Sequence, residues 1–237
     1  MATENGFAAI WDMDGTLVDT AETHFDAWHA VCLESDRDFT RADFAATFGR
    51  RNPEIIQYLF GERFDSSGIV RLGDRKEELY RAAARKGVAF LPGVRALLEE
   101  LQRAGFRQAI GSSAPRANLD LILNLTGGAH FFCAVVGMED TQRGKPDPQV
   151  FQVAAQRLGV EPRRSVVFED AVAGVQAAKA GGMKCVAVRF VAHHSEESLR
   201  AAGADLIVPT LEKVSAAAVL ELLRGENEPQ MNTDKHR

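Results

Sequence analysis

The sequence predicts an α/β fold in which helices cover both faces of a parallel sheet. From about Gly93 onward, short runs of apolar, β-forming residues alternate with segments of helical periodicity. This order is typical of parallel strands joined by helical crossovers. A further apolar run at 7–11 is followed by a long helical segment instead of a second strand, so we expect an insertion after the first strand.

Six apolar runs are predicted to be the strands of this sheet. They lie at 7–11, 107–111, 134–136, 165–168, 185–188 and 206–208. The helices of the core are expected at 116–125, at 147–158, in an Ala-rich stretch through 179, at 195–202 and at 211–223. The helix at 147–158 has the clearest boundaries, with Asp147 expected at the N-cap, Pro148 at the first helical position and Gly159 after the last helical residue.

Residues 20–86 are predicted to form a helical cap, because their apolar residues recur at helical spacing without a convincing strand pattern. These apolar residues are Phe25, Trp28, Val31, Cys32, Phe44, Phe48, Ile55, Ile56, Leu59, Phe60, Leu72, Leu79 and Tyr80. An insertion at this point lies over the carboxyl edge of the sheet, where such folds bind ligands. We therefore divide the chain into a core at 1–19 and 87–224, a cap at 20–86, and a polar tail at 225–237 that is expected to be disordered.

Composition and charge limit the classes of partner. With 28 Lys and Arg against 33 Asp and Glu, the net charge is −5, which leaves no positive excess for binding nucleic acid or an anionic membrane. Cys32, Cys133 and Cys185 are widely spaced among apolar neighbours, as expected of reduced packing residues. We see no leader pattern and no run of ~18 apolar residues, and therefore expect a cytoplasmic protein. The oligomeric state is not set by the sequence, and a monomer is compatible with it.

Chemically distinct side chains follow the first four predicted strands. In order along the chain they are Asp12 and Asp14, Ser112 and Ser113, Lys145, and Glu169 and Asp170. Because the carboxyl ends of parallel strands meet at one edge of a sheet, we expect these side chains to converge. Carboxylates suit a hard divalent cation such as Mg²⁺, while a hydroxyl and an ammonium suit a phosphate. The sequence therefore indicates phosphoryl transfer on a small phosphorylated substrate.

Phosphoryl transfer needs a nucleophile and a group that moves a proton. No Ser–His–Asp spacing or nucleophile elbow is apparent, but an Asp carboxylate can attack phosphorus and form an aspartyl-phosphate. Asp12 is nearest the end of its strand and is the candidate nucleophile. Asp14 would protonate the leaving oxygen and later deprotonate water. That role needs a carboxyl that holds a proton when the substrate is bound, and we expect the negative charge of Asp12 and closure of the cap to favour the protonated form of Asp14.

Four motifs in this order resemble those of the haloacid dehalogenase superfamily. They are Asp12-Met13-Asp14-Gly15-Thr16 with Asp19, Ser112 after Ala109-Ile110-Gly111, Gly144-Lys145-Pro146-Asp147-Pro148, and Phe168-Glu169-Asp170-Ala171-Val172-Ala173-Gly174. The resemblance covers almost the whole chain and implies a Rossmann-like parallel sheet core with an inserted α-helical cap. The roles that it implies are a nucleophilic Asp12, a general acid/base Asp14, Ser112 and Lys145 on the phosphate, and Mg²⁺ bound by Asp12, the Asp14 carbonyl and Asp170 with support from Glu169.

Within this superfamily, Asp14 argues against the dehalogenase and phosphonatase members, which generally lack an acid at this position. Residues 19–28 and 75–80 resemble β-phosphoglucomutase and its sugar-phosphatase relatives. Thr16 stands where the mutases commonly carry Val, and 113–116 looks more like a phosphatase loop. We therefore expect a Mg²⁺-dependent phosphatase of a small phosphorylated metabolite such as a sugar phosphate. A β-phosphoglucomutase-like phosphohexomutase is the main alternative, and a non-catalytic metabolite-binding protein is a remote one.

Eight residues are predicted to contact the substrate, each with a competing structural role. They are Thr16, Ser113, His24, Trp28, Arg50, Asn52, Lys76 and Arg116. His24 and Trp28 lie four residues apart, so they suit packing within the cap as well as substrate contact. The charged runs at 50–51 and 75–76 suit a solvated face as well as a cationic cover over the phosphate. Asn118 is expected on the surface of its helix.

Overall fold

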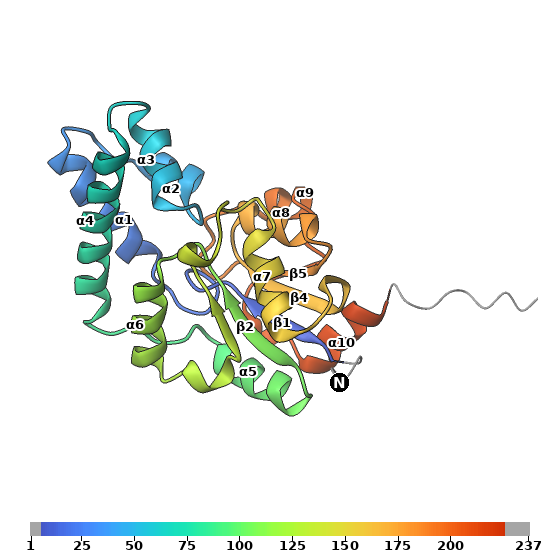
Figure 1. Ribbon diagram of the computed structural model, residues 1–237. Coiled ribbons are helices and arrows are strands. Elements are labelled where there is room, and N and C mark those ends of the chain that lie inside the picture. Colours follow the sequence, from blue (N-terminus) through green and yellow to red (C-terminus); the bar gives the residue numbers. More distant parts are fainter. Residues whose placement is uncertain (1–5, 226–237) are drawn as a thin grey trace, which may run out of the picture.

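The computed structural model describes residues 6–225 and contains within them a six-stranded parallel sheet (Figure 1). Its strands are β1 (Ala8–Trp11), β2 (Arg107–Gly111), β3 (Ala134–Val136), β4 (Ser165–Glu169), β5 (Lys184–Val188) and β6 (Leu206–Val208). They lie in the order β3-β2-β1-β4-β5-β6. Both ends of every strand lie within one residue of the prediction, and the predicted α/β fold is confirmed.

Helices cover both faces of the sheet, because successive side chains of a strand point to opposite faces. The core helices are α5 (Val94–Arg103), α6 (Arg116–Thr126), α7 (Gln149–Leu158), α8 (Val172–Ala180), α9 (Glu196–Ala201) and α10 (Ala216–Arg224). Ala9 and Trp11 of β1 join one apolar cluster with residues of α5, α6 and α10. Ala8 and Ile10 join a second cluster with residues of α7, α8 and α9. The central strand β1 is therefore buried on both faces.

The start of α7 differs by one or two residues from its prediction. The helix begins at Gln149, and Pro148 is the residue before it instead of its first residue. The carboxylate of Asp147 accepts a hydrogen bond from the backbone N–H of Gln149 at 3.0 Å. Asp147 thus caps the helix through its side chain as predicted, although it stands outside the N-cap position.

Two other core helices were predicted less well. α10 begins at Ala216 and not near 211, because the Ser215 side chain accepts the N–H of Ala218 and caps the helix there. Residues 211–213 form a separate 3-10 turn. Its buried Leu211 fits the apolar spacing of the helix that follows, so the sequence pattern placed the start of the helix too early. α5 was not singled out from the sequence, although its buried side chains follow helical spacing.

Four helices lie between β1 and β2 along the chain. They are α1 (Ala21–Glu34), α2 (Arg41–Thr47), α3 (Asn52–Phe60) and α4 (Ser66–Ala84). In Figure 1 they form a group apart from the helices that cover the sheet. Their apolar cluster, which includes Trp28, Phe44 and Ile55, is separate from the two clusters of the core. This arrangement suits a cap; the boundaries at 19/20 and 86/87 stay predictions, and the predicted disordered tail lies outside the described residues from 226 onward.

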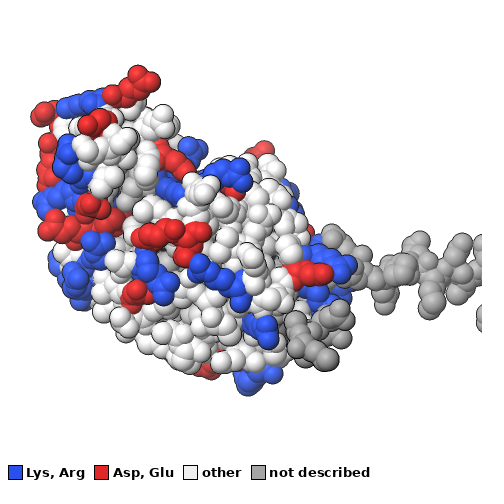
Figure 2. Space-filling view, viewed as in Figure 1, with Lys and Arg blue, Asp and Glu red and all other residues white. Residues whose placement is uncertain are grey.

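The cysteines and the surface agree only in part with expectation. All three cysteines are free, with Cys32 and Cys185 buried as predicted of packing residues. Cys133 is exposed instead, since it lies just before the edge strand β3. Acidic and basic side chains are interspersed over the face seen in Figure 2, as the near balance of charge in the sequence suggests. Over residues 6–225, none of the helices is long and apolar enough to cross a bilayer.

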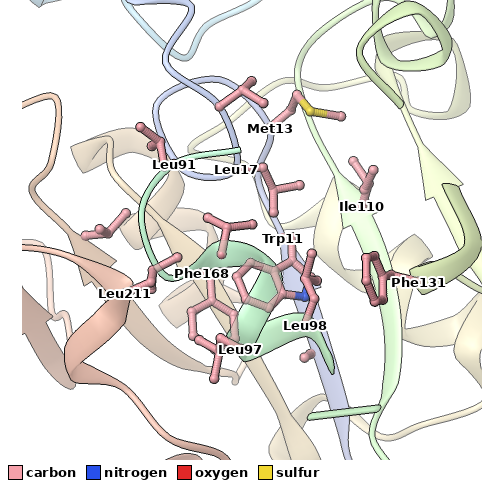
Figure 3. Packing of buried hydrophobic residues seen from close by; sticks show 14 of the residues in the cluster. Trp11, Met13, Leu17, Leu91, Leu97, Leu98, Ile110, Phe131, Phe168 and Leu211 are labelled. Carbon is pink, nitrogen blue, oxygen red and sulfur yellow. The ribbon is translucent and has the colours of Figure 1, made fainter. Parts of the chain in front are cut away.

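An aromatic pair joins the two strands that carry acids at their ends. Trp11 of β1 stacks on Phe168 of β4 with ring centroids 4.0 Å apart and planes inclined by 12°. Figure 3 shows this pair packed against Leu97 and Leu98 of α5. The indole N–H donates to the side-chain oxygen of Gln108 at 3.1 Å. The pair therefore holds β1 and β4 next to each other directly beneath Asp12 and Glu169.

We expect Trp11→Ala to lower the free energy of unfolding by about 3–5 kcal/mol, because it leaves a cavity beside Phe168. Urea unfolding followed by circular dichroism measures this change. Trp11→Phe keeps a ring on Phe168 and loses the hydrogen bond to Gln108, so it serves as the matched control with a smaller loss. An unchanged urea midpoint for Trp11→Ala would contradict a packing role for this pair.

Candidate active site

Loops at the carboxyl edge of the sheet bring the predicted catalytic side chains together. Asp12 follows β1 and Ser112 follows β2, while Glu169 and Asp170 lie at the end of β4. Because β1 lies between β2 and β4, these three strand ends adjoin. Lys145 reaches the same place from the loop before α7. Each of these side chains belongs to a residue that is at most 6% exposed, so their charges interact with little screening by water.

Lys145 is the cation at the centre of this cluster. Its Nζ donates hydrogen bonds to Asp12 Oδ1 at 2.6 Å and to Glu169 Oε1 at 2.7 Å. The other oxygen of Glu169 accepts the backbone N–H groups of Asp170 at 2.7 Å and Ala171 at 2.6 Å. Burial opposes the charge on Lys145, but the two carboxylates outweigh it and raise the pKa of Lys145 above its usual value. The ammonium is therefore retained inside the protein.

The acids around Lys145 carry more negative charge than one ammonium balances. Burial, opposed by Lys145 and aided by the charges of Glu169 and Asp14, raises the pKa of Asp12 from 3.8 to about 7. Burial and the charges of Glu169 and Asp12 also raise the pKa of Asp170 well above its usual value. The site thus favours uptake of a further positive charge, either protons or a cation.

The carboxylates have the arrangement and the free oxygen that a metal ion needs. Asp12, Glu169 and Asp170 each place one carboxylate oxygen within 4.8 Å of the others. Asp170 Oδ1 accepts a hydrogen bond from Thr16 at 3.1 Å, whereas its buried Oδ2 has no hydrogen-bond partner among the described residues. A buried carboxylate oxygen left without a donor is unfavourable unless a cation or water meets it. These residues therefore fit a hard, oxygen-liganded divalent cation.

Two glycines let the acids approach the backbone closely. Gly15 has a φ of +85°, and a Cβ on it would lie 2.2 Å from Asp170 Oδ2. A Cβ on Gly174 would lie 1.7 Å from Glu169 Oε1. Both distances are impossible for real atoms, so any larger residue must displace an acid of the cluster. The glycines of the first and fourth motifs are thus required by the carboxylates opposite them.

Asp14 faces away from this cluster toward the cap. Its Oδ1 accepts hydrogen bonds from Thr20 Oγ1 at 2.6 Å and from Tyr80 Oη at 3.1 Å. His24 Nε2 lies 3.1 Å from the same oxygen, without the geometry of a hydrogen bond. Three groups from the cap and its entry therefore surround one oxygen of Asp14.

The expected increase in the pKa of Asp14 is not what the structure shows. Burial acts in that direction, but nearby His24 and the hydrogen bond from Thr20 outweigh it, and the pKa of Asp14 falls from 3.8 to about 2. The prediction considered Asp12 and cap closure alone and omitted the groups that the cap brings to Asp14. Asp14 is therefore ionised in this conformation, which suits a base that takes a proton from water.

A buried polar chain leads from Asp14 into the cap. The Nδ1 atom of His24 lies 2.7 Å from Lys76 Nζ, and Lys76 Nζ donates a hydrogen bond to Glu77 Oε1 at 2.9 Å. The His24 ring also stacks on Tyr80 with centroids 4.1 Å apart. Lys76 is 2% exposed, so it belongs to the interior and not to a solvated face. The structure thus brings two predicted cap residues, His24 and Lys76, to Asp14.

A cavity lies between this chain and the sheet edge. Its floor is formed by Asp12, Asp14, Ser112 and Ser113. Polar cap residues on its lining are His24, Arg50, Asn52, Lys76 and Glu77, and apolar ones are Trp28, Phe44, Phe48 and Ile55. The cavity therefore combines a charged floor with an aromatic wall, as small-molecule sites commonly do.

Two residues predicted to contact substrate lie elsewhere. The hydroxyl of Thr16 is fully buried and donates to Asp170, and Thr16 does not line the cavity. The guanidinium of Arg116 pairs with Asp120 at 2.9 Å on the surface of α6, also outside the cavity lining. The other six predicted contacts line the cavity, and their roles stay predictions.

Residues that complete the site were missed from the sequence. Thr20, Tyr80 and Glu77 were not singled out as polar partners, although Tyr80 was assigned to the apolar face of the cap. Asn118 was expected on the surface, yet it is 2% exposed and donates to Glu77 Oε2 at 2.5 Å. A signal was present, because Asn118 lies four residues before Ile122 on the buried face of α6. A polar residue on an apolar helix face indicates a buried hydrogen-bond network.

Comparison with known proteins agrees with this geometry. The model of the family described as haloacid dehalogenase-like hydrolase matches residues 9–188. A fructose-1-phosphate phosphatase of Escherichia coli (strain K12) is 34% identical over 182 residues, which cover 77% of this chain and 96% of that protein. A β-phosphoglucomutase of Bacillus subtilis (strain 168) is 32% identical over 226 residues, which cover 92% of this chain and 94% of that protein.

A solved structure gives the same result for the fold. A β-phosphoglucomutase from Clostridium difficile superposes with a TM-score of 0.84 at 24% identity, covering 94% of this chain and 99% of that chain. The family model and the two relatives confirm the family resemblance predicted from the four motifs. The chain belongs to the haloacid dehalogenase-like hydrolase family.

Proposed function

We propose that this protein is a Mg²⁺-dependent phosphatase of a small phosphorylated metabolite, in particular a sugar phosphate, and that it forms an aspartyl-phosphate on Asp12. One observation carries this proposal above the others. Asp12 lines the cavity while Lys145 binds one of its two carboxylate oxygens, which leaves the other to attack phosphorus. The relatives named as a fructose-1-phosphate phosphatase and a β-phosphoglucomutase support a phosphorylated sugar as substrate.

The acids present fit Mg²⁺, which Asp12 and Asp170 would hold with support from Glu169. The family resemblance adds the Asp14 carbonyl as a further ligand. When bound, Mg²⁺ would neutralise phosphate oxygens and favour the ionised form of Asp12. Lys145 already provides one fixed positive charge beside Asp12. Ser112 Oγ accepts the N–H of Ala114 at 3.2 Å, so its own proton is available for a phosphate oxygen. These groups hold the phosphate with its charge balanced.

The reaction then proceeds in two displacements on phosphorus. The free oxygen of Asp12 forms a bond to phosphorus as the bond to the leaving oxygen breaks, and the leaving oxygen takes the proton of Asp14. Water next attacks the aspartyl-phosphate, Asp14 takes its proton, and phosphate leaves with Asp12 restored as a carboxylate. The negative charge of a bound phosphate raises the pKa of a neighbouring carboxyl, which moves Asp14 toward the protonated form that the first displacement needs.

A phosphohexomutase is the second candidate, because a β-phosphoglucomutase of Bacillus subtilis shares 32% identity over 92% of this chain. The two functions differ in whether water or a sugar hydroxyl receives the phosphate. Incubation with β-glucose 1-phosphate and a trace of the bisphosphate, followed by phosphorus NMR, separates them. Free phosphate supports the phosphatase, and glucose 6-phosphate supports the mutase.

Asp12→Asn is expected to reduce phosphate release by at least ~10³-fold, because an amide is a poor nucleophile toward phosphorus. A panel of phosphorylated metabolites with Mg²⁺ gives the wild-type rate for comparison. The thermal unfolding transition serves as the control for folding. Turnover near the wild-type rate in a folded Asp12→Asn variant would remove Asp12 as the nucleophile.

For Asp14→Asn, we expect steady turnover of p-nitrophenyl phosphate to fall by ~10²–10⁴-fold. This leaving group needs no proton, so one equivalent of nitrophenol should still appear in a burst while phosphate stays on Asp12. Rapid-mix absorbance measures the burst, and mass spectrometry of the quenched protein measures the phosphorylation. Steady release without an accumulated phosphoenzyme would show that Asp14 is not the base, and unimpaired release of an alcohol leaving group would contradict its acid role.

Removal of divalent metal with EDTA should abolish turnover, and Mg²⁺ should restore it. Independently of activity, Mg²⁺ at 100 times its dissociation constant should raise the melting temperature by about 5–10 °C. Asp170→Asn should lose most of this shift, because it removes the carboxylate with the unpartnered oxygen. An equal shift in Asp170→Asn and wild type would place the metal elsewhere.

A further inference from the structure

We propose that Asn118 is a positioning residue that holds the cap closed through Glu77 and so keeps the Lys76–His24 pair against Asp14. Asn118 lies on the core helix α6, whereas Glu77, Lys76 and His24 lie on cap helices. The inference concerns the coupling of cap closure to Asp14 and goes beyond the identity of the reaction.

Asn118 uses both ends of its amide on one cap helix. Its Nδ2 donates to Glu77 Oε2 at 2.5 Å, and its Oδ1 accepts from Arg81 Nη1 at 3.0 Å. Glu77 and Arg81 lie four residues apart on α4, so they present an acceptor and a donor side by side. An amide matches this pair, since it carries one donor group and one acceptor group. Asn118 therefore joins the core to α4 with its amide in one orientation, in which the nitrogen faces Glu77 and the oxygen faces Arg81.

Glu77 connects this contact to the rest of the cap. Its other oxygen, Oε1, accepts from Asn52 Nδ2 at 2.8 Å and from Lys76 Nζ at 2.9 Å. Glu77 is 4% exposed, so each of these donors replaces water that the carboxylate would otherwise bind. Burial acts to raise the pKa of Glu77, but Lys76, His24 and the hydrogen bonds outweigh it and lower the pKa below its usual value. Glu77 is thus an anion on which three side chains converge.

The polar chain begins and ends on the core. From Asn118 it passes through Glu77, Lys76 and His24 in the cap and returns to the core at Asp14. Opening the cap must separate Asn118 from Glu77 and His24 from Asp14 in the same movement. A cap that is not closed at Asn118 therefore cannot hold His24 in place beside Asp14.

A second polar contact between cap and core lacks this connection. Arg51, just before α3, donates to the carbonyl oxygens of Thr141 at 3.0 Å and Arg143 at 2.9 Å. These carbonyls belong to the loop that leads to Lys145. Within residues 6–225, the Arg51 side chain makes no hydrogen bond to Glu77, Lys76, His24 or Asp14. Loss of Arg51 should loosen the cap but leave the contacts of Lys76 with Glu77 and His24 intact within it. Arg51→Ala is therefore a matched control for loosening alone.

The test exchanges the polarity of the contact. Asn118→Asp places a carboxylate against the carboxylate of Glu77, so two acceptors face each other. Glu77→Gln places an amide donor against the amide donor of Asn118, so two donors face each other. In the double variant, Glu77→Gln with Asn118→Asp, the amide at position 77 can donate to the carboxylate at position 118. That carboxylate also keeps an acceptor for Arg81. Asn118→Ser is a milder break that adds no charge and is too short to reach Glu77.

Cap opening is read from the fluorescence of Trp28 without any substrate. The chain has two tryptophans, so Trp11→Phe leaves Trp28, which is 2% exposed and lines the cavity. In that background we expect acrylamide quenching to rise at least ~3-fold in each single variant and to return to within about twofold of the parent in the double variant. Unchanged quenching in the folded single variants, or a double variant as exposed as they are, would overturn the proposal.

Turnover supplies the second readout and separates positioning from loosening. We expect Asn118→Asp and Asn118→Ser to lower kcat by ~10–100-fold even at saturating substrate, because Asp14 loses its contact with His24. Arg51→Ala should raise KM with kcat near wild type. Bound substrate can still close the cap, and the polar contacts from Asn118 to Asp14 are then intact. An equal loss of kcat in Arg51→Ala would reduce Asn118 to a general cap contact. If the proposed reaction itself fails, the quenching result still decides whether Asn118 holds the cap closed.

Discussion

The buried ammonium of Lys145 is the interaction on which the site depends. Without it, Asp12 and Glu169 would face each other at the end of adjacent strands with no positive charge between them. An unpaired buried carboxylate is strongly unfavourable, and two of them close together are more so. Lys145 removes that conflict and at the same time fixes one oxygen of Asp12. The neutralisation is incomplete, because Asp170 adds a third carboxylate, and this deficit is what makes the site receptive to a divalent cation.

The framework around this cluster follows from the order of the strands. β1 is central, and its stacked Trp11–Phe168 contact fixes it against β4 just beneath the acids. Gly15 and Gly174 then allow the carboxylates of Asp170 and Glu169 to approach where any Cβ would collide with them. The aromatic stack beneath the acids and the two glycines beside them thus act together to position the carboxylates. The rigid sheet sets the spacing of the acids, and the glycines leave room for their charge.

The sequence predicts the convergence of these loops well, because it depends on strand order and on residue type. Asp12, Ser112, Lys145, Glu169 and Asp170 follow short apolar strands, and parallel strands must end at one edge. The effect of the cap on the pKa of Asp14 was predicted in the wrong direction, since it depends on His24 and Thr20 and on how the cap folds back over the sheet. Asn118 was misplaced for a related reason.

Asn118 also shows what a local pattern omits. Its partners Glu77 and Arg81 lie 41 and 37 residues away on another helix, and helical periodicity carries no information about such pairs. The buried face of α6 includes Asn118, but which group satisfies its amide depends on the docking of α4. Long-range polar pairing is thus the part of this site that the sequence leaves open. Apolar periodicity and loop chemistry account for the rest.

The two acids of the first motif differ because different parts of the protein surround them. Burial is the main cause that raises the pKa of Asp12 to about 7, and its charged partners, Lys145 and Glu169, belong to the core. Those that lower the pKa of Asp14 to about 2 are His24 and Lys76 of the cap and Thr20 at its entry. Motion of the cap therefore separates Asp14 from the groups that lower its pKa, whereas the charged partners of Asp12 stay beside it. Opening the cap thus removes the groups that hold Asp14 ionised, and this is the change that the proposed transfer of a proton by Asp14 would use.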